Sequence, residues 1–174
     1  MKVVVLTGPE STGKTWLAER LAQRFGGQVV GEYVREFIDR ERRDTCLADI
    51  PHIARMQLER EDQVRAAQPP LLLLDTHLLS NILWSRTLFG SAPNWLESEL
   101  LARHYDLHLL LSPEGVPWHD DGQRCQPDLI DRQRFHADCR DWLLANGQPV
   151  IELSGDWPAR EAAAIEQLQR LLTC

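Results

Sequence analysis

Short apolar runs alternate along the chain with longer stretches that have the 3.6-residue period of helices. The candidate strands are the apolar runs at residues 2–7, 29–32, 71–75, 107–112 and 150–153. Residues 14–25 predict a helix with Leu17, Leu21 and Phe25 on one face, and residues 159–172 predict another. The apolar face expected for that last helix consists of Ala162, Ile165, Leu168 and Leu172.

The alternation of strands and helices determines the fold class. Parallel neighbouring strands need crossover connections, and the crossover helices cover both faces of the sheet. We therefore predict an α/β fold, a three-layer sandwich around a five-stranded parallel sheet in the order 2-3-1-4-5, with residues 1–174 forming one domain. Ligands of such folds bind at the carboxyl ends of the strands.

Two segments exceed what a minimal sheet-and-helix unit needs. Residues 39–68 are charged and helix-prone, with a break near Asp49, Ile50 and Pro51. Residues 117–138 are polar, rich in Arg and Asp, and lie between the fourth and fifth candidate strands. We predict that this second segment is a small mobile flap; a solvated helix with a loop is the alternative.

Composition and charge restrict the partners of the chain. Its 174 residues are 43% apolar and 26% charged, as in an ordinary globular domain. A net charge of −7 argues against a nucleic-acid or membrane surface, whereas a small anion needs only a few local cations. Neither a signal peptide nor a run of roughly 18 apolar residues is present, which predicts a cytoplasmic protein. The oligomeric state does not follow from the sequence.

The residue types that bind metals or form disulfides have no informative spacing. Cys46, Cys125, Cys139 and Cys174 contain no C-x-x-C pair, so we expect neither a zinc site nor a disulfide framework. The six histidines show no ligand spacing, and His77 is expected to belong to a helix.

Residues 8–15, GPESTGKT, match the phosphate-loop motif G-x-x-x-x-G-K-[ST] in full, between a candidate strand and a candidate helix. The two glycines let backbone N–H groups turn inward, and the helix adds its positive dipole end. Lys14 is expected to reach the β- and γ-phosphates, and the Thr15 hydroxyl to bind Mg²⁺. The predicted ATP-binding residues of this loop are Gly8, Glu10, Ser11, Thr12, Gly13, Lys14 and Thr15.

Asp75 closes the apolar run LLLLD. A carboxylate at the carboxyl end of a buried strand is expected to meet the Mg²⁺ ion through water. The alternative is a helix N-cap, because Asp75 and Thr76 also begin the next helical stretch. Asp75 is accordingly a candidate metal ligand and acceptor-site residue.

Three classes of protein share the phosphate loop: GTPase switches, mechanical or AAA-type ATPases, and small-molecule kinases. The chain lacks an N-K-x-D-like guanine reader, and a remodelling ATPase usually has a longer chain with a second subdomain. A kinase needs an acceptor pocket, a base for the acceptor hydroxyl and a flap that excludes water. Candidates for all three are present, which favours a kinase; an ATP-binding regulatory module without a small acceptor is the alternative.

The candidate base lies in GEYVREF, at the end of the second candidate strand. Glu32 is placed to take a hydroxyl proton during phosphoryl transfer, with Asp75 as the second choice. Arg35 is expected on the same helical side, where it holds Glu32 or a phosphate. Tyr33 is a candidate to stack on a flat ring. The alternative for Glu32 and Arg35 is a surface ion pair at a helix start.

The flap segment carries the candidate catalytic arginine. Arg124, Arg132 and Arg134 are candidates to bind phosphate oxygens, although a solvated helix face explains Arg132 and Arg134 equally well. Arg124 is favoured because it follows a turn sequence. Trp118 with Asp120 and Asp121 suits a flat cationic ring or a ribose diol; a loop with a buried Trp is the alternative. Trp84 and Trp95 are expected to pack in the core or in a subdomain.

The segments GPESTGKT, EYVREF, LLLLDTHLL, YDLHLLLSP, VPWHDDGQR and SGDWPAR follow one another over nearly the whole chain. Together they resemble the ribosylnicotinamide kinase domain, best known as the C-terminal half of the bifunctional NAD-biosynthesis regulator of bacteria, among AAA-like P-loop kinases. The resemblance implies ATP- and Mg²⁺-dependent phosphorylation of the 5′-hydroxyl of nicotinamide riboside to nicotinamide mononucleotide.

The resemblance also implies roles for single residues. Trp157, after Asp156, matches a segment where P-loop kinases commonly place the adenine. His77 stands where the family often has a second Asp, and Gly31 where an aromatic residue often precedes the EY pair, so a kinase for another nucleoside is a further alternative. The implied acceptor-side and flap residues are Glu32, Tyr33, Arg35, Asp75, Trp118, Asp120, Asp121 and Arg124.

Overall fold

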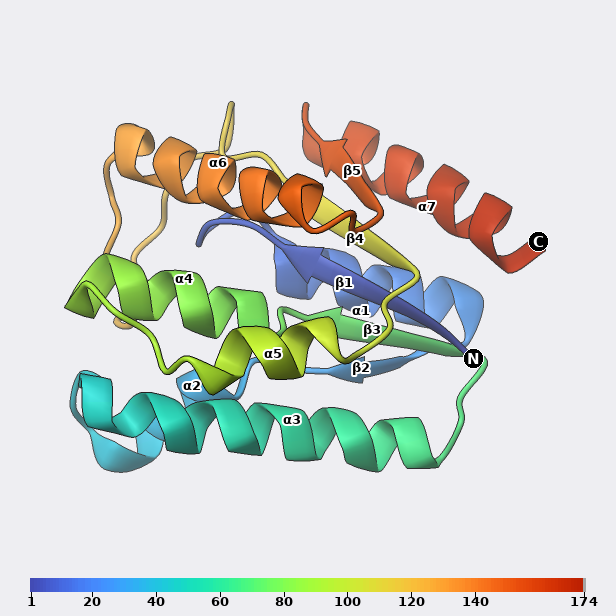
Figure 1. Cartoon of the computed structure of the whole chain (residues 1–174). Helices are drawn as coiled ribbons and strands as arrows, with labels where there is room; N and C mark the ends of the chain where they lie inside the picture. The colour runs from blue at the N-terminus through green and yellow to red at the C-terminus, as the bar shows by residue number, and fades with distance from the viewer. Residues whose placement is uncertain (174) are drawn as a thin grey trace.

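The computed structural model describes residues 1–173 and shows one parallel sheet between two layers of helices (Figure 1). The five strands pair in the order β2-β3-β1-β4-β5, and all neighbours are parallel. The predicted three-layer α/β fold and strand order are confirmed. The strands are β1 (Lys2–Thr7), β2 (Gln28–Val30), β3 (Leu71–Asp75), β4 (Leu107–Leu111) and β5 (Val150–Leu153).

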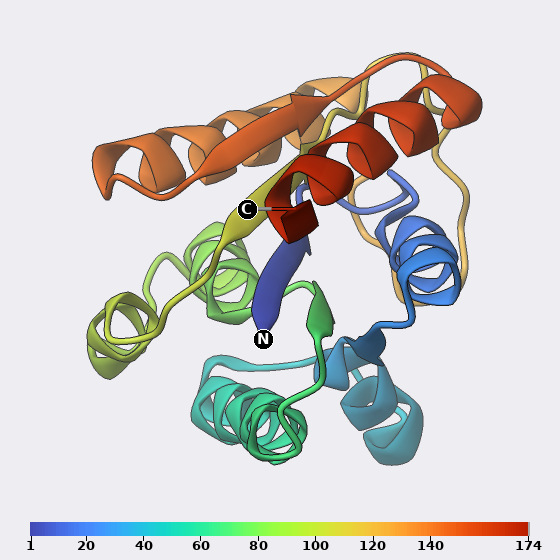
Figure 2. The same cartoon turned by 90° about the vertical axis from the view of Figure 1, so that its right-hand side faces the viewer.

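The helices divide between the two faces of the sheet (Figure 2). Helices α1 and α7 cover one face, and α3, α4, α5 and α6 cover the other. None of the helices within residues 1–173 combines the length and apolar character that crossing a membrane requires. The helices are α1 (Lys14–Phe25), α2 (Tyr33–Glu41), the 3₁₀ helix η1 (Leu47–Asp49), α3 (Ile50–Ala66), α4 (Leu78–Phe89), α5 (Trp95–Leu101), α6 (Leu129–Ala145) and α7 (Trp157–Thr173).

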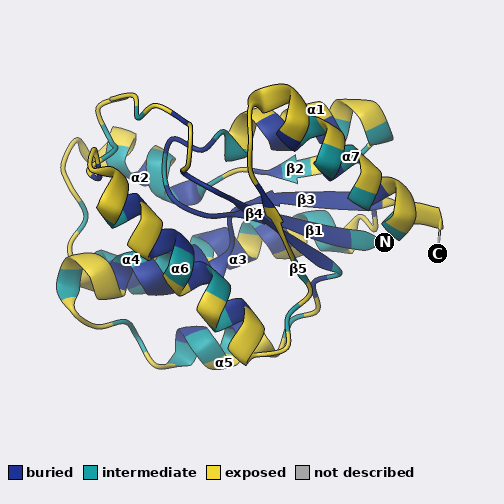
Figure 3. Ribbon diagram, turned by 90° about the horizontal axis from the view of Figure 1, so that it is seen from above, coloured by how far each residue is buried: buried dark blue, intermediate teal, exposed yellow. Residues whose placement is uncertain are grey.

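Alternate side chains of the strands fill two separate cores. In β1, Val4 and Leu6 pack toward α1 and α7, whereas Val3 and Val5 pack toward α3, α4 and α6. Successive strand residues point to opposite faces, so a strand covered on both sides must be apolar throughout. Figure 3 shows the result: the central strands β1, β3 and β4 are buried almost throughout, and exposure lies on the edge strands, the outer faces of the helices and the loops.

Strand β2 ends earlier than the predicted 29–32. The side-chain amide of Gln57 on α3 accepts a hydrogen bond from the Tyr33 N–H at 2.8 Å and donates one to the Gly31 carbonyl at 3.3 Å. These are the backbone groups that would have extended the ladder with β3, so the chain leaves the sheet at Gly31. Glu32 is therefore the N-cap residue of α2 and not a strand residue.

The break predicted within residues 39–68 is confirmed at Asp49. The Asp49 carboxylate accepts the Cys46 N–H at 2.8 Å at the start of η1, and Pro51 lies in the first turn of α3. Proline suits that position because the first N–H groups of a helix have no intrahelical partner. Helix α2, however, already begins at Tyr33, before the segment that we predicted to be helical.

The buried face of α7 differs from the prediction. Ala164 and Leu168 are buried together with Arg160, while Ala162 and Leu172 are exposed. Arg160 donates hydrogen bonds to the carbonyl oxygens of Ser112 (2.7 Å), Glu114 (3.1 Å) and Gly155 (2.7 Å). A charged side chain satisfied in this way defines the inward face, which a purely apolar pattern does not show.

The predicted flap, residues 117–138, comprises a loop followed by the first part of α6, which packs into the core through Phe135 and Cys139. Arg132 is 4% exposed and donates to the Val116 carbonyl, so it does not belong to a solvated helix face. Arg134 is exposed and lies 3.5 Å from Asp131. Neither arginine lines a cavity with the phosphate loop, and Arg124 alone of the three does.

Candidate active site

The phosphate loop connects β1 to α1 and has the backbone geometry that its glycines predict. At Gly8, where φ is 128°, an added Cβ would lie 2.7 Å from the Leu111 carbonyl oxygen. Gly13 has φ 84° and is the N-cap residue of α1. Any other residue would strain both positions, so the loop depends on these two glycines.

Lys14 bends over the loop, and its ammonium donates to the carbonyl oxygens of Gly8 (3.0 Å) and Pro9 (2.7 Å). Burial lowers the pKa of Lys14 below its ordinary value, and the nearby Glu32 and Asp75 carboxylates partly oppose this effect. A desolvated ammonium is stabilised by a nearby anion. Lys14 is therefore placed to bind a phosphate group at this loop.

Thr15 and Asp75 meet at the edge of the loop. The Thr15 hydroxyl donates a hydrogen bond of 2.5 Å to a carboxylate oxygen of Asp75. Asp75 is 4% exposed, and the next residue, Thr76, turns the chain with φ 66° and donates its N–H to the Leu6 carbonyl at 3.0 Å. A hydroxyl and a carboxylate beside a phosphate site are the hard oxygen donors that Mg²⁺ prefers, so these two residues fit that ion.

Glu32 is held by an arginine that also contacts the flap loop. Arg35 lies 3.3 Å from the Glu32 carboxylate and 2.7 Å from that of Asp121. Burial raises the pKa of Glu32, although the Lys14 ammonium opposes the shift. A carboxylate with a raised pKa is a stronger base than an exposed one, which suits proton abstraction.

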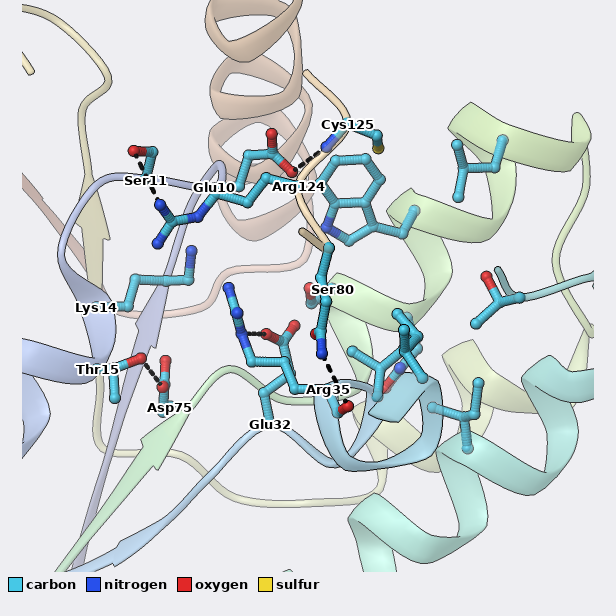
Figure 4. Close-up of a pocket in the computed structure, with 18 of the residues that line it drawn as sticks. Glu10, Ser11, Lys14, Thr15, Glu32, Arg35, Asp75, Ser80, Arg124 and Cys125 are labelled. Atoms are coloured by element: carbon cyan, nitrogen blue, oxygen red, sulfur yellow. Dashed lines mark hydrogen bonds and ion pairs between the residues drawn. The ribbon is translucent and has the colours of Figure 1, made fainter. Parts of the chain in front are cut away.

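One cavity of about 600 Å³ joins these groups to an apolar chamber. At one end lie the phosphate loop and Asp75; Glu32, Arg35 and Arg124 line the middle (Figure 4). The chamber at the other end is formed by apolar side chains of α2, α3 and α4, namely Val34, Ile38, Ile50, Ile53, Trp84, Leu88 and Phe89. Such a mostly apolar cavity with a few convergent polar groups is typical of a small-molecule site.

The structure brings most of the predicted site residues together. The predicted residues that line the cavity are Glu10, Ser11, Thr12, Gly13, Lys14, Thr15, Glu32, Arg35, Asp75 and Arg124. Their chemical roles stay predictions, because the structure carries no nucleotide or acceptor. Their convergence comes from the sheet, since β1, β2 and β3 all end at this edge.

Other predicted residues lie outside the cavity lining. Tyr33 is 1% exposed and packs between His52 and Arg60, so it has no free face for a ligand ring. Trp118 and Asp121 line no part of the cavity. The Trp118 indole donates to Glu10, and the Asp121 carboxylate pairs with Arg35. The further predicted residues without a place in the lining are Gly8, Asp120 and Trp157.

Trp157 lies beside the phosphate loop and not in the cavity. Its ring covers Gly13 so closely that a Cβ there would come within 2.0 Å of it. It meets Trp16 edge-on, with 5.4 Å between the ring centroids, and 41% of Trp157 is exposed. This exposed aromatic pair, formed by the first turns of α1 and α7, suits the predicted adenine contact.

The side chains that form the apolar end of the cavity were not predicted from the sequence. Trp84, which we expected to pack in the core, packs on Phe135 at 4.7 Å between ring centroids and also lines the cavity. Trp95 does pack against the core, as expected. Asp44 and Thr45, in the loop after α2, line the same cavity. The only available signal for Trp84 was its place on the helix that follows Asp75.

The fold and the site define a P-loop protein with the architecture of ATP-dependent nucleoside kinases. Residues 3–160 match a family of AAA domains, and the chain belongs to that family. The fold that the resemblance implies is confirmed by two structures of NadR protein, one in complex with NR and one with NAD and AMP-PNP. They match 99% of this chain with TM-scores of 0.83 and 0.79, at 23% and 22% identity.

The NadR proteins are longer than this chain, which spans 52% and 50% of their length. Deoxyadenosine kinase from M. mycoides with bound dATP matches over 97% of this chain and all of its own, with a TM-score of 0.67 and 10% identity. At these identities the likeness shows a shared fold. Which acceptor this chain uses has to be argued from its own site.

Proposed function

We propose that this chain is an ATP-dependent kinase that phosphorylates the 5′-hydroxyl of a nucleoside-like acceptor, with nicotinamide riboside as the favoured acceptor. The observation that supports this most directly is the continuity of the cavity. The phosphate loop and a chamber large enough for a ring open into one space, with Glu32 between them. A cytoplasmic location, which the sequence predicts, agrees with the use of ATP.

On the donor side, cationic groups hold the phosphates. Lys14 and the backbone N–H groups of residues 10–13 bind the β- and γ-phosphates, and Arg124 faces the transferring group. Thr15 and Asp75 would hold Mg²⁺, and the ion would supply positive charge to the phosphate oxygens. Trp157 and Trp16 offer ring faces to the adenine at the outer side of the loop.

At the centre of the cavity, Glu32 acts as the general base. The acceptor 5′-oxygen forms a bond to the γ-phosphorus while the bond from that phosphorus to the β–γ bridging oxygen breaks, which leaves ADP. The hydroxyl proton passes to the Glu32 carboxylate, and Arg35 keeps that carboxylate in place. Most of the rate enhancement comes from alignment and charge stabilisation.

The acceptor chamber suits a flat cationic ring. Trp84 supplies an aromatic face, and cation–π contacts with Trp are the strongest of their kind. The carboxylates of Asp44, Glu32 and Asp75 line the same cavity and lower the energy of a positive ring. The pyridinium ring of nicotinamide riboside is positively charged, whereas the bases of adenosine and deoxyadenosine are neutral.

A product assay tests the proposal. The protein is incubated with ATP, Mg²⁺ and one acceptor at a time: nicotinamide riboside, its reduced uncharged form, adenosine or deoxyadenosine. Mass spectrometry measures the phosphorylated product, and ADP release is followed in parallel. We expect nicotinamide riboside to give the largest product yield and Lys14→Ala to abolish it.

Two results would correct the proposal. Preference for adenosine or deoxyadenosine would keep the kinase but replace the acceptor. Slow ADP release that no acceptor stimulates would support the ATP-binding regulatory module.

A further inference from the structure

The loop 117–126 is held against the phosphate loop by the side chain of Glu10. One carboxylate oxygen accepts hydrogen bonds from the Trp118 indole N–H and the Gln126 backbone N–H, both at 2.7 Å. The other accepts the Cys125 backbone N–H at 3.1 Å. The carboxylate therefore joins both ends of this loop to a residue of the phosphate loop more than 100 positions earlier in the chain.

The neighbouring residue, Ser11, makes the same connection. Its hydroxyl donates to the Pro117 carbonyl at 3.2 Å and accepts the His119 N–H at 3.0 Å. It also lies 3.5 Å from the Arg124 guanidinium. Ser11 has φ 61°, a conformation that glycine adopts without strain. Serine at this position therefore adds a hydroxyl at a backbone cost, and that hydroxyl binds the loop.

The middle of the loop is held on the acceptor side. Asp121 pairs with Arg35 at 2.7 Å, and the Gln123 amide donates to Asp39 at 2.6 Å. The loop thus runs from the phosphate loop to α2, and its residues Arg124 and Cys125 line the cavity between them (Figure 4). Arg124 is further fixed by its 2.6 Å hydrogen bond to the His119 carbonyl.

The Glu10 carboxylate places a negative charge in the phosphate loop. A carboxylate in a phosphate-binding loop repels the triphosphate, so binding ATP is not what its side chain favours. Three N–H groups donate to it, and no lysine or arginine pairs with it within residues 1–173. Hydrogen bonds to an ionised acceptor are about twice as strong as neutral ones, so this carboxylate suits the fixing of a loop.

We propose that Glu10 is a positioning residue: it holds the loop 117–126 closed over the phosphate loop, sets Arg124 toward the transferring phosphoryl group and keeps water out of the cavity. This inference rests on the proposed kinase function for the role of Arg124. The contacts of Glu10 with the loop do not depend on the identity of the acceptor. Removing Glu10 opens the loop, and ATP then loses its phosphoryl group to water more often than to the acceptor.

The test uses four variants of the whole chain. Glu10→Ala removes all three contacts, Trp118→Phe removes one donor and keeps a ring, and Ser11→Gly removes the hydroxyl while tolerating φ 61°. Glu19→Ala, an exposed carboxylate of α1 without a partner among residues 1–173, is the matched control. Trp118→Phe and Ser11→Gly keep the test valid if Glu10→Ala folds poorly.

For Glu10→Ala we expect kcat to fall about tenfold, the ratio of ATP hydrolysis to transfer to rise about tenfold, and the KM for ATP to stay level or fall. A lower KM is the opposite of what losing an ATP contact produces, because a repulsive charge has been removed. Trp118→Phe and Ser11→Gly should change the ratio in the same direction by less. Glu19→Ala should match the unmodified protein.

Amide hydrogen exchange separates this inference from the kinase assignment. The N–H groups of Cys125 and Gln126 should exchange faster in Glu10→Ala than in the unmodified protein, with or without an acceptor. Unchanged exchange at these amides overturns the proposal, as does a raised KM for ATP with kcat intact. If the unmodified protein phosphorylates no nucleoside, the proposed function fails, and the exchange result alone decides the role of Glu10.

Discussion

The Thr15 hydroxyl donates a 2.5 Å hydrogen bond to the Asp75 carboxylate and so connects the first turn of α1 to the end of β3. Strands β1 and β3 are direct neighbours, with Leu6 opposite Asp75, which brings these residues together although they are 60 positions apart. The same adjacency places two oxygen donors beside the phosphate loop. The proposed magnesium site thus follows from the strand order, and the proposal can be tested at either residue.

Asp75→Asn should raise the Mg²⁺ concentration needed for half-maximal activity by about tenfold or more, because a neutral amide is a weaker ligand for a hard cation. Nucleotide binding should be retained, since the phosphate loop is unchanged. A Mg²⁺ titration of the transfer rate measures the shift. Asp138→Asn, on the exposed side of α6, is the control. An unaltered Mg²⁺ requirement in Asp75→Asn would show that the carboxylate does not serve the metal.

Glu32→Gln should spare ATP binding and lower kcat by about 10² or more, because the amide cannot accept the hydroxyl proton. Burial raises the pKa of Glu32 above its ordinary value of 4.5, and the base acts only when deprotonated. The rate of the unmodified enzyme should therefore fall as the pH is lowered toward this raised pKa, and the fall should begin well above pH 4.5.

The pH profile of kcat distinguishes the two candidate bases. In Glu32→Gln, the fall in kcat at low pH that protonation of Glu32 causes should disappear. Glu36 is an exposed residue of the same helix, and Glu36→Gln should keep this fall. Nearly full turnover by Glu32→Gln would contradict the assignment. If Glu32→Gln has a low kcat that still falls further at low pH, the result would point to Asp75 as the base.

The sequence predicts those parts of the fold and the site that depend on local patterns of residues. The strands of the sheet and the GPESTGKT loop depend on neighbouring residues, so their positions were correct to within a few residues. The cavity wall depends on packing between α2, α3 and α4, where an apolar side chain such as Ile53 looks like any core residue. Trp84 packs on the core, as expected, and its second role in lining the cavity could not be recognised for this reason.

Trp118 shows that contacts between residues far apart in the chain could not be predicted either. Its adjacency to Asp120 and Asp121 suggested a ligand site, but its indole N–H is donated to Glu10, 108 residues earlier. No local pattern reveals such a partner. Conversely, Arg35 was correctly expected to hold Glu32, because their spacing of three residues lies at one helix start.

Trp84→Leu should raise the KM for a cationic acceptor by about tenfold and leave the KM for ATP unchanged, because a desolvated cation–π contact contributes up to about 2 kcal/mol. Trp84→Phe keeps a ring and should lose less. Steady-state kinetics with nicotinamide riboside and with its uncharged reduced form measure the difference. Trp95→Phe, which alters a residue packed on the core away from the cavity, is the control. Equal losses for the charged and uncharged acceptors would rule out a contact with the positive ring.

His77 and His108 form a buried pair that should make the fold sensitive to acid. The His108 Nδ1–H donates to the Pro149 carbonyl at 3.0 Å, which leaves its Nε2 to accept the His77 Nε2–H at 3.2 Å. Both side chains are fully buried, and Tyr105 packs against both rings. Burial holds the pKa of His77 well below its ordinary value of 6.5 and lowers that of His108 to about 4.

Below pH 6.5 the unfolded chain binds protons at these two sites that the folded chain does not, so stability should fall as the pH decreases toward 4. Each histidine adds about 1.4 kcal/mol per pH unit to the slope of the unfolding free energy in this window. Urea unfolding at several pH values measures that slope. The double variant His77→Leu and His108→Leu should have a shallower slope, whereas His119→Gln, an exposed histidine, should not change it. A double variant with the slope of the unmodified protein would mean that other groups cause its acid sensitivity.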